Sequence, residues 1–142
     1  MTREWEQQLY NNGYRITASR CAIMEVLREA QEPLSAQELL ARGRQHHRTL
    51  GIVTVYRTLD LLSELGLVRR VHRSDGCHGY LSASPGHHHA ILCLHCGRAS
   101  EFQGQDDLIE LLGRVRRETG FEIDDHLLQL YGTCSECRAH DV

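Results

Sequence analysis

The first 65 residues carry apolar side chains at intervals of three and four positions, which is the spacing of amphipathic helices. This pattern predicts helices over residues 3–11, from residue 17 to a stop at Pro33, from residue 35 onward, and over residues 53–65. Ser35 and Glu38 have the spacing of a capping box, in which both side chains satisfy free backbone N–H groups. Gly66 follows the fourth helix, where a glycine commonly ends a helix.

Shorter patterns follow the helices. Residues 67–71 are predicted to form a strand, residues 74–76 a turn, and the residues around Tyr80 a returning strand. The small residues 82–86 include a proline and a glycine and mark the expected boundary between two domains, residues 1–84 and 85–142. Three helices followed by a hairpin are typical of a winged helix-turn-helix domain.

The second domain is predicted to contain strands over residues 88–93 and 98–102, a helix capped by Asp106, and a long strand over residues 121–131. The apolar residues expected on the inward face of that helix are Leu108, Leu111, Leu112 and Val115. The predicted fold class is therefore α+β, with an N-terminal winged helix-turn-helix domain and a small C-terminal α/β domain.

Four cysteines give the strongest chemical signal. They form two C-x2-C pairs, Cys93 with Cys96 and Cys134 with Cys137. Two residues between thiolates let one tight turn direct both sulfur atoms at one ion, and two such turns complete a tetrahedral zinc site. Because four thiolates leave no open position for a substrate, we expect this zinc to be structural.

Composition supports a soluble metalloprotein. Of the 142 residues, 41% are hydrophobic and 25% are charged, which excludes wholesale disorder. No apolar run approaches the roughly 20 residues of a membrane span, and the polar N-terminus lacks a signal-peptide core. A cytoplasmic protein with no membrane partner is therefore expected, in which six cysteines favour metal binding over disulfides.

Charge and the fourth predicted helix together indicate operator DNA as a partner. Residues 1–84 hold 11 arginines and 9 acidic residues, whereas residues 85–142 hold 5 and 10. Thr54, Tyr56, Arg57 and Thr58 are expected on the exposed face of the recognition helix, where Arg57 can pair with guanine and Tyr56 can pack on a thymine methyl group. The arginines predicted to meet phosphates are Arg15, Arg20, Arg69, Arg70 and Arg73.

Several motifs in their order along the chain resemble the ferric uptake regulator family. They are Tyr14-Arg-Ile-Thr17 with Arg20, Thr54-Val-Tyr56-Arg57 with Leu59, His87-His-His89 before the first cysteine pair, Glu101-Phe102, His126, and Tyr131-Gly before the second cysteine pair. The resemblance spans nearly the whole chain. It implies a homodimeric, metal-dependent transcriptional repressor in which the C-terminal domain is a dimerisation domain.

The resemblance also implies a sensory metal site between the two domains, with ligands at His88 and Glu101. This chain departs from the family pattern at Pro33, Leu81 and Ala90, where many members carry metal-binding side chains. Two donors of the predicted wing, His72 and Cys77, are the expected substitutes. Because a thiolate favours zinc over ferrous iron, this set predicts a zinc-sensing repressor of zinc-uptake genes.

A second family site is implied at His87, His89 and His126. His87 and His89 are expected on one side of their strand and His88 on the other, because side chains alternate along a strand. The acidic ligand of this site aligns with Ile109, so we expect the adjacent Glu110 to replace it, with Asp107 as the alternative.

Three other functions compete with zinc-dependent repression. A ferrous-iron or peroxide sensor would share the scaffold, and a zinc-stapled interaction module would bind DNA without sensing metal. A zinc hydrolase would need an open zinc and a positioned base, but the chain has neither H-E-x-x-H nor a deaminase signature. We therefore expect no enzymatic activity and no small-molecule substrate.

Overall fold

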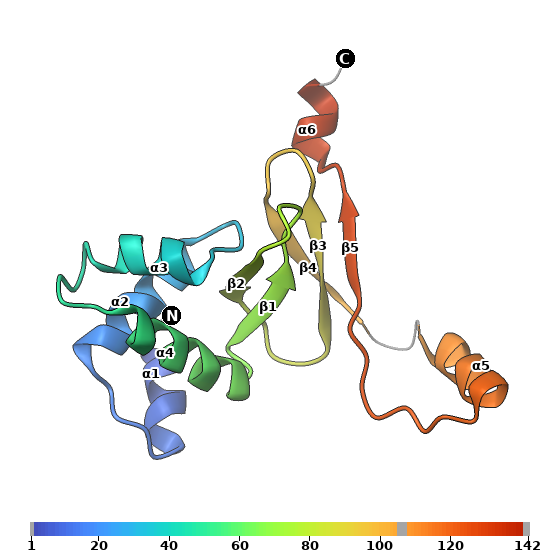
Figure 1. Cartoon of the computed structure of the whole chain (residues 1–142), viewed down its shortest axis with the longest axis horizontal. Coiled ribbons are helices and arrows are strands. Elements are labelled where there is room, and N and C mark those ends of the chain that lie inside the picture. Colours follow the sequence, from blue (N-terminus) through green and yellow to red (C-terminus); the bar gives the residue numbers. More distant parts are fainter. Residues whose placement is uncertain (1, 105–107, 141–142) are drawn as a thin grey trace.

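Four helices form the N-terminal unit around one apolar core (Figure 1). They are α1 (Thr2–Asn11), α2 (Ala18–Glu29), α3 (Ala36–Gly43) and α4 (Ile52–Glu64). The computed structural model describes residues 2–104 and 108–140. Each helix contributes fully buried side chains to this core, among them Leu9, Ile23, Leu27, Leu39, Val55, Leu59 and Leu62. All four helices predicted from the apolar spacing are confirmed.

The cap predicted at Ser35 and the glycine stop predicted at Gly66 are confirmed, and the structure adds a cap at Thr17. Thr17 Oγ1 accepts a hydrogen bond from the Arg20 N–H at 3.2 Å, and Ser35 Oγ accepts one from the Glu38 N–H at 3.1 Å. Both bonds satisfy donors that a helix N-terminus leaves free. Gly66 follows α4 with a φ of 73°, the left-handed conformation that favours glycine after a helix.

Two small sheets follow the helices. Strands β1 (Val68–His72) and β2 (His78–Ser82) form the antiparallel hairpin, which we call the wing. The second sheet has the order β4-β3-β5, with β3 (His88–Cys93) antiparallel to β4 (Ala99–Gln103) and parallel to β5 (Gln129–Gly132). Helix α5 (Ile109–Thr119) precedes β5, and the short helix α6 (Ser135–His140) follows it. The mixed helix-and-sheet architecture confirms the predicted α+β class.

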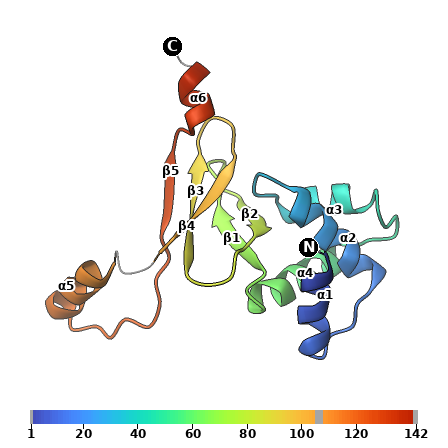
Figure 2. The ribbon, with the colours of Figure 1, turned by 180° about the vertical axis from the view of Figure 1, so that it is seen from behind.

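The wing packs against one side of the C-terminal sheet (Figures 1 and 2). A small apolar cluster joins them, in which Val71 and Leu81 of the wing meet Ala90 and Leu92 of β3. Because strand residues alternate, the other side of the sheet carries Ile91 and its register neighbour Leu130, which is 43% exposed. We call these the wing-facing side and the outer side of the sheet.

Two expectations about the C-terminal half are wrong. Of the strand predicted over residues 121–131, only residues 129–131 pair with a neighbour, in a strand that ends at Gly132, and residues 121–128 have no regular structure. Helix α5 lies apart from the C-terminal sheet (Figure 2). It has no buried residue, and Leu111 is 42% exposed. Leu112 and Val115 of α5 are half-buried, so none of the apolar side chains expected to face inward belongs to a buried core. Asp106, the expected cap of this helix, lies outside the described residues.

No helix of the described residues is both long enough and apolar enough to cross a lipid bilayer.

Candidate metal centres and nucleic-acid interface

The four cysteines of the two C-x2-C pairs come together at the end of the sheet that carries α6. Their Sγ atoms lie within 4.8 Å of one another, and Cys93–Cys137 and Cys96–Cys134 are each separated by 3.8 Å. A tetrahedron of Zn–S bonds of about 2.3 Å has an S–S edge of about 3.8 Å, whereas a disulfide would require about 2.05 Å. The four side chains therefore fit one tetrahedral zinc ion and no disulfide.

Backbone geometry prepares the first cysteine pair for this role. Gly97 adopts a φ of 79° in the turn after Cys96, which lets the chain fold back and donate the Gly97 N–H to the Cys93 carbonyl at 3.0 Å. Hydrogen bonds from the backbone at Cys96 and Cys134 lower the pKa of the Cys93 thiol to about 5. Hydrogen bonding to the Cys134 side chain, together with burial, raises the pKa of Cys137 to about 12. The lowered pKa favours the thiolate form of Cys93, which is the form that binds a metal ion.

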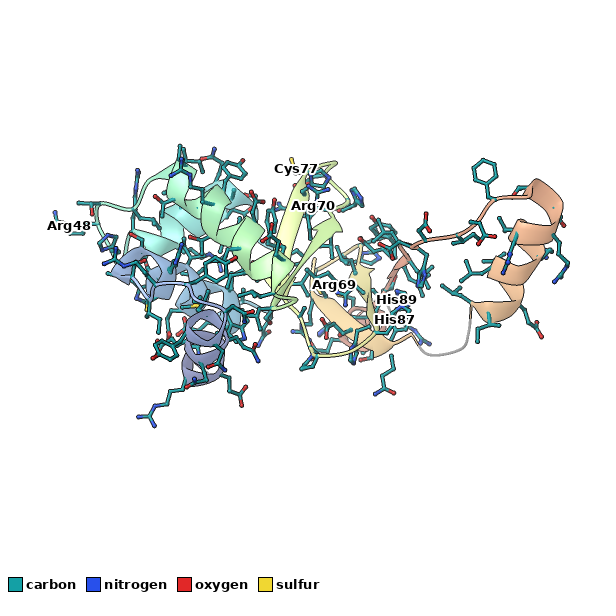
Figure 3. All side chains as sticks on the ribbon, turned by 90° about the horizontal axis from the view of Figure 1, so that it is seen from below. Arg48, Arg69, Arg70, Cys77, His87 and His89 are labelled. Atoms are coloured by element: carbon teal, nitrogen blue, oxygen red, sulfur yellow. The ribbon has the colours of Figure 1, made fainter. Side chains whose placement is uncertain are left out.

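Three histidines form the second group on the outer side of the sheet. The ligand nitrogens of His87, His89 and His126 lie within 4.8 Å of one another, and the Nε2 atoms of His87 and His126 are 3.0 Å apart. The ring centroids of His87 and His89 are separated by 4.7 Å, which places both on one side of the strand as predicted (Figure 3). His89 is buried against the Phe102 ring, with centroids 5.6 Å apart. Three converging imidazoles are a donor set that suits zinc.

Gly104 provides the space that this arrangement needs. A Cβ atom at Gly104 would lie 2.2 Å from the His89 ring, and the Gly104 N–H donates to the His87 carbonyl at 3.0 Å. No sequence signal pointed to this glycine. The structure does not bring Glu110, which is exposed on α5, into the histidine group, and Asp107 lies outside the described residues.

Helix α4 presents the side chains expected to read DNA. Tyr56 is 47% exposed, and Arg57 is exposed on the same helix. Thr58 departs from expectation because it is only 2% exposed and its Oγ1 donates to the Thr54 carbonyl at 2.7 Å. This bond inside the helix satisfies the hydroxyl group, so Thr58 packs with the core. Thr54 is half-buried.

The arginines predicted to contact phosphates divide into two groups. Arg15 and Arg70 are exposed, and the half-buried Arg20 donates to the Arg15 carbonyl at 2.5 Å. Arg69 instead faces the C-terminal sheet, with its Nε atom 3.7 Å from Glu101 Oε1 (Figure 3). Arg73 pairs with Glu38 at 2.5 Å and with Asp75 at 2.8 Å. Arg69 and Arg73 are therefore engaged by carboxylates of this chain.

These features agree with comparisons to known proteins. The sequence profile described as the ferric uptake regulator family matches residues 11–131. The chain belongs to the ferric uptake regulator family. It is 33% identical over 142 residues to the ferric uptake regulation protein of Bacillus subtilis (strain 168), and the match covers 96% of this chain and 94% of that protein. Members of this family are metal-responsive transcriptional regulators rather than enzymes, and they bind DNA as dimers.

Solved structures of ferric uptake regulator family proteins share the fold. Holo XcZur matches with a TM-score of 0.79 and 27% identity, over 97% of this chain and 96% of that chain. A zinc uptake regulator complexed with zinc and DNA matches with a TM-score of 0.82 and 22% identity, over 99% of this chain and 94% of the other. The second match establishes likeness of fold alone.

The four residues predicted as the sensory site of this family member are not gathered. Among the described residues, His72, Cys77, His88 and Glu101 form no group of three whose ligand atoms lie within 4.8 Å of one another. Cys77 is exposed at the tip of the wing (Figure 3). The His72 ring is tilted against the His78 ring, with centroids 4.9 Å apart. His88 and Glu101 share the wing-facing side of the sheet. Glu101 there accepts hydrogen bonds from the Ser84 N–H at 3.1 and 3.2 Å.

Proposed function

We propose that this chain is a zinc-responsive transcriptional repressor that binds operator DNA as a metal-loaded homodimer and represses zinc-uptake genes. The observation that carries the proposal is the convergence of His87, His89 and His126, which joins β3 to the segment that precedes β5. Imidazole and thiolate donors suit zinc, and the chain supplies a separate four-thiolate site for a structural zinc ion.

The regulatory zinc is assigned to the outer side of the sheet. His126 belongs to the segment of residues 121–128, which has no regular structure and follows the unburied helix α5. Drawing His126, His87 and His89 onto one ion would fix this segment against the sheet. Glu110 of α5 would serve as the fourth ligand once the helix closes over the site. The same event would order an apolar surface around Leu130, which is 43% exposed, and Phe121, which is 71% exposed.

We assign this ordered surface to a second copy of the chain. Leu127 is 70% exposed and Ile109 61% exposed, which is a large amount of apolar area for a single small domain. Pairing through a two-fold axis would bring both α4 helices to one DNA duplex, at half-sites about one DNA turn, roughly 34 Å, apart or at overlapping half-sites. The metal would then favour the DNA-competent dimer, and operator DNA would raise metal affinity by reciprocity.

Metal specificity can be tested directly. An operator is first selected in vitro from random DNA with the zinc-loaded protein, and binding is then titrated with zinc or, without oxygen, with ferrous iron. We expect zinc to restore binding to protein that retains only its structural zinc, and ferrous iron to fail. Activation by ferrous iron at lower concentrations would favour the second candidate, an iron- or peroxide-sensing repressor; the name of the Bacillus subtilis relative supports the iron-sensing form. Metal-independent binding would favour an interaction module that does not sense metal.

Zinc content per protomer tests the site assignments. Wild-type protein should hold two or three zinc ions, and His126→Ala should lose one while His46→Ala, a control at an exposed surface histidine, loses none. Cys96→Ser should lose the structural ion. The set of His72, Cys77, His88 and Glu101 remains a prediction, and loss of one zinc ion in Cys77→Ser would support it.

A further inference from the structure

The wing is joined to the C-terminal sheet through the backbone of His72. The side-chain carboxamide of Gln129 accepts the His72 N–H at 3.0 Å and donates its own N–H to the His72 carbonyl at 2.6 Å. The Tyr131 hydroxyl group donates to the same carbonyl at 2.8 Å and accepts from Gln129 at 3.0 Å. One amide side chain therefore pairs with a strand residue in the way that a neighbouring strand would. We call these four bonds the Gln129 clamp.

The position of the clamp follows from the register of the sheet. Gln129 pairs with Ala90 and Tyr131 with Leu92 along the parallel β3–β5 ladder, so both lie on the wing-facing side. His72 ends β1, which is an edge strand with backbone groups free to accept a partner. The clamp therefore joins the last strand of the C-terminal sheet to the edge of the wing, 57 positions away in sequence.

Two further contacts fix the same interface at other points. The apolar cluster of Val71, Leu81, Ala90 and Leu92 lies between the wing and the sheet. Arg69 of β1 approaches Glu101 of β4 at 3.7 Å. The apolar cluster is not directional and the ion pair holds a single point, whereas the two hydrogen bonds from the Gln129 side chain to the His72 backbone fix the register of the wing, because they are directional.

We infer that Gln129 and Tyr131 are positioning residues that lock the wing onto the C-terminal sheet and thereby set the DNA half-site spacing that the dimer recognises. The wing continues directly from α4, whose last residue, Glu64, is four positions before Val68. A shift of the wing relative to the C-terminal sheet would therefore also shift α4, the helix expected to read DNA. This inference rests on the proposed DNA-binding dimer but not on the identity of the metal.

The first test measures the clamp itself. In the metal-loaded full-length protein, the His72 amide hydrogen should exchange with solvent about tenfold faster in Gln129→Ala than in wild type. The reason is that the variant lacks both hydrogen bonds that Gln129 makes to the His72 backbone. Tyr131→Phe, which removes a single hydroxyl group, should cause a smaller increase in the same amide. Gln103→Ala is the matched control, since Gln103 is an exposed glutamine of the same sheet. Unchanged His72 exchange in Gln129→Ala would overturn the inference.

The second test reads the effect on DNA. Wild type and variants are titrated against an in vitro-selected operator and against copies whose half-sites are moved apart or together by one base pair. We expect Gln129→Ala to bind the selected operator about tenfold more weakly and to lose most of the preference between spacings, with zinc content and circular dichroism unchanged. A spacing preference equal to that of wild type, despite faster His72 exchange, would show that the clamp has no positioning role. Failure of wild type to bind DNA in a metal-dependent way would instead contradict the proposed function.

Discussion

Arg69 of the wing points its Nε atom at Glu101 Oε1 across 3.7 Å, whereas its neighbour Arg70 is exposed to solvent. The two side chains leave opposite sides of one strand, because strand residues alternate. Arg69 therefore contacts the C-terminal sheet, whereas Arg70 is free to contact a DNA phosphate.

This difference predicts different salt dependences of DNA binding. Arg70→Ala should reduce the slope of log affinity against log salt concentration by about 1, because one phosphate contact and its released counterion are lost. Arg69→Ala should leave that slope unchanged and instead weaken the contact between the wing and the C-terminal sheet. Fluorescence anisotropy with one operator over a range of salt concentrations measures both slopes. Equal reductions of the slope in Arg69→Ala and Arg70→Ala would contradict the assignment of the phosphate contact to Arg70 alone.

The space at Gly104 gives a prediction about metal affinity. Gly104→Ala would place a methyl group 2.2 Å from the His89 ring, so the ring must move out of the histidine group. Zinc affinity at that site should fall about 10- to 100-fold, the range found when groups that orient metal ligands are changed. Gly113→Ala is the control, because a Cβ atom there meets only the flexible end of Arg117, at 3.4 Å. Competition titration with a chromogenic chelator would measure both affinities, and equal affinities would rule out this role for Gly104.

The N-terminal helices and the cysteine pairs could be predicted from sequence because their signals are local. Apolar spacing, the capping box of Ser35 and Glu38, and the two-residue gap between thiolates each describe a few neighbouring positions. The strand predicted over residues 121–131 fails because a strand needs a partner, and β3 offers one only to residues 129–132. The ion pair of Arg69 and the Gln129 clamp depend on how two sheets meet, which periodicity does not encode.

The ion-pair group of Arg73 predicts a pH dependence of stability. Burial raises the pKa of Glu38, but hydrogen bonds from Arg73 and Ser35 outweigh it and hold the pKa below its ordinary value. A hydrogen bond from the Cys77 backbone, with the charge of Arg73, also lowers the pKa of Asp75. Both carboxylates bind protons more weakly when folded. Their stabilisation is therefore present above the ordinary pKa of each group and lost as pH falls through the lowered folded-state value.

Comparison of wild type with Arg73→Gln isolates this contribution. At pH 7 the variant should be less stable, with an electrostatic loss of no more than about 1 kcal/mol because Glu38 is 40% exposed and solvent screens the pair. The difference in the free energy of unfolding should narrow as pH falls from 5 to 3. Urea denaturation at several pH values provides the measurement. A difference that stays constant with pH would assign the loss to packing of the Arg73 side chain.

The exposed face of α4 gives the most direct prediction about sequence recognition. Arg57 is exposed one position after Tyr56, near the N-terminal end of the helix, which is where base-reading side chains lie in helix-turn-helix proteins. Arg57→Ala should lower operator affinity by about 1–3 kcal/mol and relax the preference for guanine at one position of each half-site. Arg48→Ala, at an exposed arginine of the loop between α3 and α4, should weaken binding to specific and random DNA alike if it contacts phosphate. Selection of operators with each variant separates the two effects. An Arg57→Ala protein that selects the wild-type operator would remove Arg57 from base recognition and leave Tyr56 as the principal exposed reader on this helix.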